Sequence, residues 1–184
     1  MTGDIYLAGL WKKKIPEGLM WHFGFQMKSR PSEYVAPTWS WAIARIQIHY
    51  NSPHRYGETY HIEILDAETI PAGPDEMGAV LGGKITLRGQ MKEVRLRRDL
   101  LTGAYETWGT GAERGEKVGN SDPNLVLELI NAMQGPLWCL RVSGKHGLLL
   151  KTSGADYQRV RIFVANDMGR DWFHNSEQRT WTLV

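Results

Sequence analysis

Cysteine, net charge and long apolar runs are all scarce in this sequence. Its 184 residues include one cysteine, Cys139, so the chain cannot form an internal disulfide or a cysteine-built zinc site, and it suits a reducing compartment. The 22 basic and 20 acidic residues leave a net charge of +2, too balanced to indicate nucleic-acid binding. No run approaches the ~18 apolar residues that span a bilayer, and the amino terminus lacks a signal-peptide cleavage pattern. We therefore expect a cytoplasmic protein without membrane insertion.

The motifs that bind common cofactors are also missing. The sequence has no phosphate loop, no dinucleotide glycine fingerprint and no GxSxG elbow. Its six histidines show no HExxH or other close metal-ligand spacing. We therefore predict a protein that uses neither a metal nor a cofactor.

Short strands dominate what remains. Alternating or continuous apolar patterns predict strands at 42–50, 60–70, 84–99, 136–142, 146–152 and 157–165, and the carboxyl-terminal tail also ends strand-like. Many short strands separated by turn residues are typical of all-β folds. We predict a single domain over 1–184 that is mainly β, an antiparallel β-barrel or sandwich with one or two short amino-terminal helices.

Two regions depart from the strand pattern. Residues 1–30 are predicted to form a helical lead-in packed on a β-rich body that spans 41–184. Within the lead-in, residues 5–25 carry apolar side chains at mixed spacings, which predicts two short helices broken at Pro16. The Gly-rich segment 102–124 predicts a long loop, and loops of that length often act as lids.

Eight tryptophans are the outlier of the composition, and two of them flank Ser40. If Trp39 and Trp41 enter a strand, they project to one face, because side chains repeat every second residue. We interpret them first as a plug between the leading helices and the sheet; the alternative places one indole at a pocket wall. Ser40 is interpreted as structural. The residues predicted to line a substrate pocket are Trp39, Trp41, Tyr50, His49 and Trp138.

His61 and Glu63 are the candidate catalytic pair, with Tyr60 as a further hydrogen-bond donor. On a strand, the two side chains point to one face about 7 Å apart. Such a pair can polarise or deprotonate a bound substrate, but a solvent-facing sheet edge explains the same pattern without any chemistry. His49 has the same two interpretations.

Three other features are assigned structural roles. The arginine-rich stretches 92–99 and 157–163 are interpreted as solvated strand faces, because no stacking motif accompanies the arginines. Cys139 lies in an apolar strand and is predicted to belong to the core rather than to act as a nucleophile.

Five segments, taken in order, resemble the region that follows the signalling domain in fungal heterokaryon incompatibility (HET) proteins. They are "YLAGLWKKKIPEGLMW", "RPSEYVAPTWSWA", "HIEILDAETIPAGPDEMGAVLGGKITLRGQM", "GLLLKTSGADYQRVRIFVA" and "DWFHNSEQRTWTLV". The resemblance covers nearly the whole chain and implies a fungal source. It supplies no catalytic residues for this region. The amino-terminal half of that family, which is implicated in cell death, has no counterpart here, so the incompatibility function is not carried over.

Two functions are therefore expected. The first is a cofactor-free cyclase or isomerase of fungal secondary metabolism, such as a catalyst of intramolecular [4+2] cyclisation of an apolar terpenoid or polyketide. Such a reaction needs an apolar cavity that holds the reacting groups together, and one or two donors such as His61 or Tyr60. The second is a non-enzymatic regulatory or interaction module, in which the tryptophans fill the core or an interface. The expected partner is a small apolar substrate, with a homodimer left open.

Overall fold

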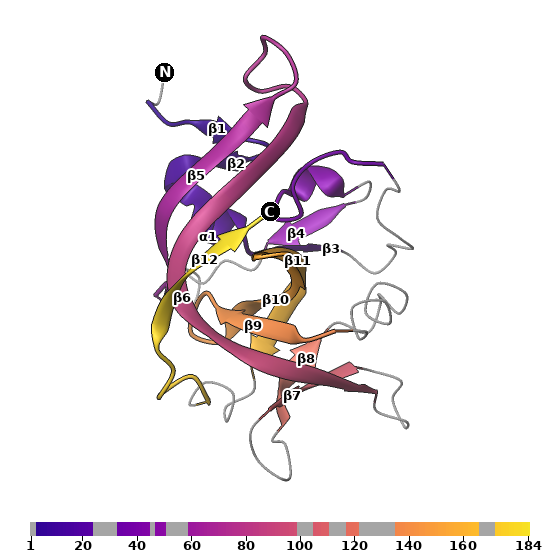
Figure 1. Cartoon of the computed structure of the whole chain (residues 1–184), viewed down its shortest axis with the longest axis vertical. Coiled ribbons are helices and arrows are strands. Elements are labelled where there is room, and N and C mark those ends of the chain that lie inside the picture. The colour runs from indigo at the N-terminus through magenta and orange to yellow at the C-terminus, as the bar shows by residue number, and fades with distance from the viewer. Residues whose placement is uncertain are drawn as a thin grey trace.

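The computed structural model describes residues 3–23, 33–44, 47–50, 59–98, 105–110, 117–121, 135–165 and 172–184. The chain is mainly β and its strands pair almost entirely antiparallel, as predicted (Figure 1).

The amino-terminal segment mixes strands with helical turns. Its elements are β1 (Tyr6–Leu7), β2 (Leu10–Trp11), a 3-10 turn η1 (Lys12–Lys14), α1 (Ile15–Gly18) and β3 (Trp21–Phe23). Pro16 stands in the first turn of α1, where its missing N–H costs no hydrogen bond. The prediction of two helices broken at this proline is therefore wrong: Pro16 helps to start α1, and short strands flank it. Residues 24–30 of the predicted helical lead-in lie outside the described residues.

A second correction concerns the predicted strand at 42–50. Trp41–Ile43 form a 3-10 turn, η2, because the Ser40 hydroxyl caps it by accepting a hydrogen bond from the Ala42 N–H at 2.9 Å. Among the described residues of this stretch, the strand is β4 (Ile48–Tyr50), which pairs with β3 in a separate two-stranded ribbon. Trp41 therefore does not enter a strand, and period-two alternation does not govern the two indoles.

The central element is one long strand, β6 (Val80–Arg98), which curves across the molecule (Figure 1). Its first half pairs with β5 (Glu63–Pro71) and β12 (Gln178–Leu183), and its second half pairs with β7 (Tyr105–Gly109) and β9 (Leu137–Arg141). The exchange of partners follows Gly89. A Cβ on Gly89 would lie 3.0 Å from Ile62 and 3.1 Å from Leu140, so a side chain at this crossing would have to push those neighbours aside.

The remaining strands close a ring of antiparallel pairs. They are β8 (Lys117–Ser121), β10 (His146–Ser153) and β11 (Asp156–Ala165). Going round the ring, β6 pairs with β9, β9 with β10, β10 with β11, β11 with β8, β8 with β7, and β7 with β6. The strands β7 and β8 fall inside 102–124, so the prediction of one continuous loop there is wrong.

The strands β9 and β10 are buried on both faces, which explains their almost continuous apolar sequence. Leu148 and Leu150 face one core cluster, whereas Leu149 and Cys139 face the other. The first cluster lies between this layer and the amino-terminal elements and includes Trp39. Cys139 is completely buried, which confirms the core assignment.

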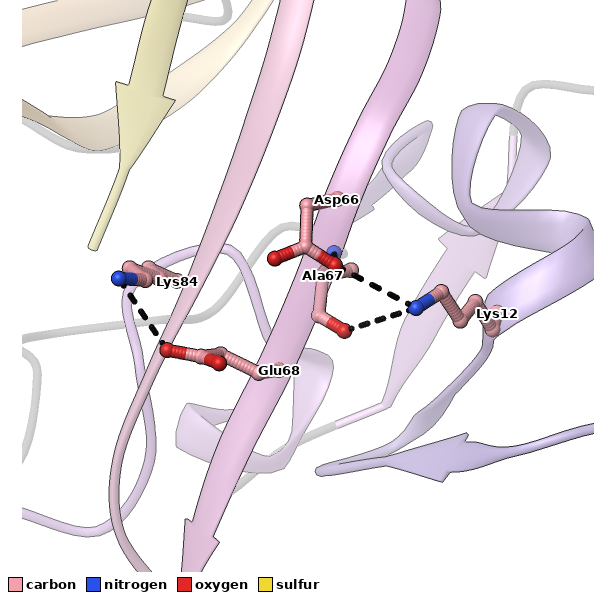
Figure 2. A network of polar contacts seen from close by, with 5 residues as sticks. All are labelled: Lys12, Asp66, Ala67, Glu68 and Lys84. Carbon is pink, nitrogen blue, oxygen red and sulfur yellow. Dashed lines mark hydrogen bonds and ion pairs between the residues drawn. The ribbon is translucent and has the colours of Figure 1, made fainter.

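Lys12 attaches the amino-terminal segment to the edge of the sheet. In the described part of the chain β5 pairs only with β6, and β1 lies alongside it. The Lys12 ammonium donates to the Ala67 carbonyl at 3.3 Å and contacts Asp66 Oδ1 at 3.5 Å (Figure 2). On the neighbouring strand Lys84 pairs with Glu68 at 3.2 Å. These exposed pairs contribute little stability, but the lysine covers backbone that an edge strand leaves unpaired.

Candidate functional site

An open groove with a volume of about 740 Å³ lies between the amino-terminal elements and β4. The described residues that line it are Asp4, Gly9, Leu10, Trp11, Lys13, Lys14, Glu17, Gly18 and Tyr50. All except Tyr50 come from the first eighteen residues. The groove is therefore built where one short segment of chain meets the ribbon of β3 and β4.

The turn between β1 and β2 shapes one wall of the groove. Ala8 and Gly9 have φ values of 44° and 100°, the left-handed conformation that a two-residue hairpin turn requires. The Gly9 carbonyl accepts a hydrogen bond from the Trp41 indole, and the Ala8 carbonyl accepts one from the Ser40 hydroxyl. Ser40 is buried, and its hydroxyl both donates to the Ala8 carbonyl and accepts from the Ala42 N–H, which confirms its structural role.

Asp4 shapes the opposite end. Its carboxylate accepts hydrogen bonds from the backbone N–H groups of Ile5 at 2.9 Å and Lys13 at 3.1 Å. The Lys13 ammonium in turn donates to the Gly3 carbonyl at 3.0 Å. These contacts bend the chain back on itself, and they place Lys13 and the adjacent Lys14 on the groove wall.

Two exposed aromatic side chains form the apolar part of the groove. Trp11 is 42% exposed and Tyr50 is 48% exposed, although large aromatic residues are mostly buried. Trp11 packs edge-on against Tyr6, with ring centroids 5.3 Å apart. Tyr50 is held by its pairing with Trp21, which is itself buried. Each ring is thus held by a neighbouring element while a large part of its surface stays accessible.

The tyrosines near the groove remain protonated at neutral pH. Burial raises the pKa of Tyr50, and Glu17 and Tyr6 raise it further, while Arg159 lowers it. Burial and the Glu17 carboxylate raise the pKa of Tyr60 to about 12. Glu17 lines the groove and forms an exposed ion pair with Lys14 at 3.7 Å. The groove therefore offers a phenolic donor, a carboxylate and ammonium groups around an aromatic surface.

The catalytic residues predicted from the sequence lie outside the groove lining. His61 precedes β5 and donates its backbone N–H to Val142. Glu63 begins β5, is exposed and pairs with Arg88 at 3.2 Å. The two do not share a strand, so the predicted strand from residue 60 is wrong at its start. Neither His61 nor Glu63 lines the groove. Tyr60 does not line it either, although the charge of Glu17, which does, raises the pKa of Tyr60.

The predicted substrate-binding residues divide into separate environments. Tyr50 lines the groove, and His49 lies opposite His22 on the other face of the ribbon. Trp39 is completely buried in the first core cluster, where its carbonyl accepts the Trp21 indole N–H at 2.9 Å. Trp41 is half-buried between that cluster and the groove wall.

Trp138 belongs to a different aromatic cluster. It packs against Tyr157 at 6.2 Å and Trp181 at 6.4 Å between ring centroids, on strands β9, β11 and β12. The three half-buried rings border the first core cluster. The structure therefore does not gather Trp138 with Trp39, Trp41 and Tyr50 around one cavity.

Sequence reasoning missed most of the groove. The apolar residues of this segment predict helices and draw attention away from its charged and exposed side chains. The groove residues missed in this way are Trp11, Lys13, Lys14 and Glu17. The available signal was a tryptophan followed directly by three lysines, because such a charged neighbourhood places a large aromatic side chain beside solvent.

A serine and a histidine side chain lie near one another between β9 and β10. Ser143 Oγ and His146 Nδ1 are 3.5 Å apart in the turn between β9 and β10, longer than a normal hydrogen bond. Both residues are buried, and the backbone of His146 accepts from Val142 and Ser143. The backbone hydrogen bonds close the turn, and neither side chain lines the groove.

Within the described ranges, no three His, Cys, Asp or Glu side chains are placed to hold a metal ion together. None of the described helices has the length and apolar character needed to span a bilayer. Comparison with protein-family models, with curated proteins and with solved structures finds no match to this chain.

Proposed function

We propose that this protein binds a small, largely apolar organic molecule in the groove between its amino-terminal segment and Tyr50. The observation that carries the proposal is the pair of exposed rings, Trp11 and Tyr50, on one groove of about 740 Å³. Pockets for small ligands commonly measure about 300–1,000 Å³ and combine apolar walls with a few polar groups. The groove has both properties.

The polar groups narrow the class of ligand. The Tyr50 hydroxyl is protonated at neutral pH and donates to a carbonyl or ether oxygen. The Lys13 and Lys14 ammonium groups favour an acceptor or an anion at the same rim, while Glu17 disfavours a second anionic group. The ligand that fits is a ring system or short chain bearing one carbonyl or carboxylate.

A titration with a panel of terpenoid and bicyclic aromatic ketones and carboxylic acids tests this binding. The indole N–H signal of Trp11 and the backbone amide signals of Trp11 and Tyr50 are expected to shift until binding saturates. Trp11→Ala and Tyr50→Ala should weaken binding about tenfold or more, because each removes one aromatic wall. The control is Leu81→Ala, which trims a side chain that is 68% exposed and lies outside the groove lining. Equal affinity in all three variants would exclude the groove.

The cofactor-free cyclisation expected from the sequence is the more specific form of this proposal. Two aromatic walls can hold a flexible substrate with its reacting ends together, which lowers the entropic part of the barrier. The Tyr50 hydroxyl can polarise a conjugated carbonyl in the transition state. This assignment moves the donor role from His61 and Tyr60 to Tyr50, since only Tyr50 of those three lines the groove.

Conversion of a linear polyene ketone, followed by mass spectrometry and chiral chromatography, tests the catalytic form. Faster cyclisation than in buffer, with an excess of one stereoisomer, is the expected result. Tyr50→Phe should retain binding but slow conversion, because it removes only the hydroxyl. Binding without accelerated conversion would exclude catalysis on that substrate class and leave the binding function intact.

An interaction module is the second candidate, and the openness of the groove favours it. Protein interfaces are enriched in Trp and Tyr at their centre and are surrounded by a polar rim, and the groove has the same composition. Ile5, which is 56% exposed, belongs to the same segment and extends its apolar surface. A peptide-display selection against the wild-type protein, with Trp11→Ala as the counter-selection, is expected to yield apolar peptides if this function holds. Sedimentation over a range of concentrations tests whether the chain forms the homodimer that the sequence leaves open.

A further inference from the structure

Two histidines oppose one another on the β3–β4 ribbon. His22 and His49 are paired directly in the antiparallel register, with ring centroids 5.6 Å apart and planes inclined by 28°. Their neighbours Trp21 and Tyr50 project from the other face, because side chains alternate along a strand. Since Tyr50 lines the groove, the histidine pair lies on the face that the groove does not use.

We propose that His22 and His49 bind one divalent transition-metal ion, with an imidazole from each strand and solvent in the other positions. Neutral imidazole is a preferred ligand for Zn²⁺, Ni²⁺ and Cu²⁺, and affinity is greatest for Cu²⁺. Zinc–nitrogen bonds measure about 2.0–2.1 Å, so the two donor atoms must lie close together. Rotation about χ2, a broad torsion in histidine, brings nitrogens of rings at this separation to one ion.

The surroundings of the pair suit an accessible two-residue site. His49 is exposed and His22 is half-buried, so an ion can approach from solvent. The Trp21 carbonyl next to His22 accepts from the buried Arg159 guanidinium, which also stacks on the Trp21 ring at 3.7 Å. This anchors β3 and limits the movement of one ligand, which favours binding. The single thiol, Cys139, is buried and does not compete for the ion.

Metal binding at this position has a structural consequence. The ribbon consists of three residue pairs outside the eight-stranded sheet, and a two-stranded ribbon alone is marginally stable. An ion held by both strands favours the paired state by mass action. Because the same pairing holds Tyr50 at the groove, the ion would also stabilise that wall.

Titration of the full chain with Cu²⁺, followed by electron paramagnetic resonance, tests the proposal. We expect one ion per chain with nitrogen hyperfine structure from imidazole. His49→Asn and His22→Asn should each weaken binding about tenfold or more, since loss of even an outer-shell partner costs 10–100-fold in metal affinity. His174→Asn changes another exposed histidine far along the chain and should leave the affinity unchanged.

A thermal unfolding series supplies the second readout. Excess Zn²⁺ should raise the unfolding temperature of the wild-type chain and of His174→Asn, but not that of His49→Asn. If His22→Asn fails to fold, His49→Asn decides the matter, because its side chain is exposed. Absence of saturable Cu²⁺ binding at millimolar concentration, or unchanged affinity in His49→Asn, would overturn the proposal. Neither result affects ligand binding in the groove, which is measured without metal.

Discussion

The guanidinium of Arg159 lies 3.7 Å above the centre of the Trp21 ring, and both side chains are almost completely buried. Arg159 also donates to the Trp21 carbonyl. This contact joins β11, in the ring of strands, to β3, in the ribbon that carries Tyr50. It therefore couples the groove to the core of the fold.

Arg159→Lys should reduce the free energy of unfolding by about 2 kcal/mol. A planar guanidinium can stack on the indole and donate a hydrogen bond from its edge at the same time, whereas an ammonium group cannot do both. Urea denaturation measures the loss. The matched control is Arg179→Lys, whose side chain is 67% exposed beside Glu177, and it should change stability by less than about 0.5 kcal/mol. Equal effects of the two substitutions would contradict a structural role for the stacked pair.

Gly9 is required by its close approach to Trp41. A Cβ on Gly9 would lie 2.7 Å from the Trp41 indole nitrogen, and the backbone has a φ of 100°. Gly9→Ala should therefore cost about 2–3 kcal/mol of stability, from backbone strain and from the clash together. Gly154→Ala separates the two terms: its φ is 63° but nothing lies within 4 Å, so it should cost only about 1 kcal/mol. Chemical denaturation of both variants gives the comparison.

Ala8 is the one non-glycine residue with a positive φ among the described residues, at 44°. Ala8→Gly relieves a strain of about 1–2 kcal/mol but removes a buried methyl group that contributes about 0.8 kcal/mol. We expect a neutral or slightly more stable protein by thermal unfolding. Ala36→Gly removes a methyl group that is buried to the same extent without relieving such strain, and should destabilise by about 1 kcal/mol. A large loss in Ala8→Gly would show that the turn is not strained.

Tyr60 should make stability fall at alkaline pH. Burial raises its folded-state pKa from 10.0 to about 12, so above pH 10 the unfolded chain loses a proton that the folded chain keeps. Stability is fully present below pH 10 and is lost as the pH rises toward 12. Because Tyr60 is half-buried rather than fully buried, we expect a loss of about 1 kcal/mol or less. Tyr60→Phe should flatten the pH dependence of the unfolding midpoint over this window.

Cys139 should be unreactive in the folded protein. Complete burial raises the pKa of its thiol well above the usual range, which leaves no accessible thiolate. Labelling with a thiol reagent is expected to require unfolding and to proceed at the rate of global opening. Cys139→Ala should lower the free energy of unfolding by about 1 kcal/mol and Cys139→Ser by about 2 kcal/mol. The serine costs more because its hydroxyl leaves water for an apolar site that offers it no hydrogen-bond partner. Fast labelling under native conditions would contradict the buried assignment.

The strand content was predictable because it depends on local patterns. The apolar stretches around Cys139 and Leu149 correctly indicated strands, since side chains buried on both faces leave a continuous apolar signal. The segment at 42–50 was misassigned because the Ser40 cap sets up a 3-10 turn there. Strands β7 and β8 were missed because their glycine-rich sequence carries a weak strand signal.

Of the predicted site, Tyr50 alone lines the groove. The prediction grouped residues by alternation along strands, but the groove joins residues of the first eighteen positions to Tyr50 through the register of β3 and β4. The contact of Lys12 with the edge of β5 further fixes that segment. Such long-range partners leave no periodic trace in the sequence.

By itself, the sequence determined the mainly β class, the buried thiol and the structural role of Ser40, because burial and capping depend on residue type and near neighbours. Only the tertiary structure decided that Trp39 enters the core, that Trp41 supports a turn and that Trp11 and Tyr50 stay exposed together. The physical reason is that burial of an indole contributes a similar free energy at any well-packed site. The elements that surround the side chain in the fold therefore determine where it packs.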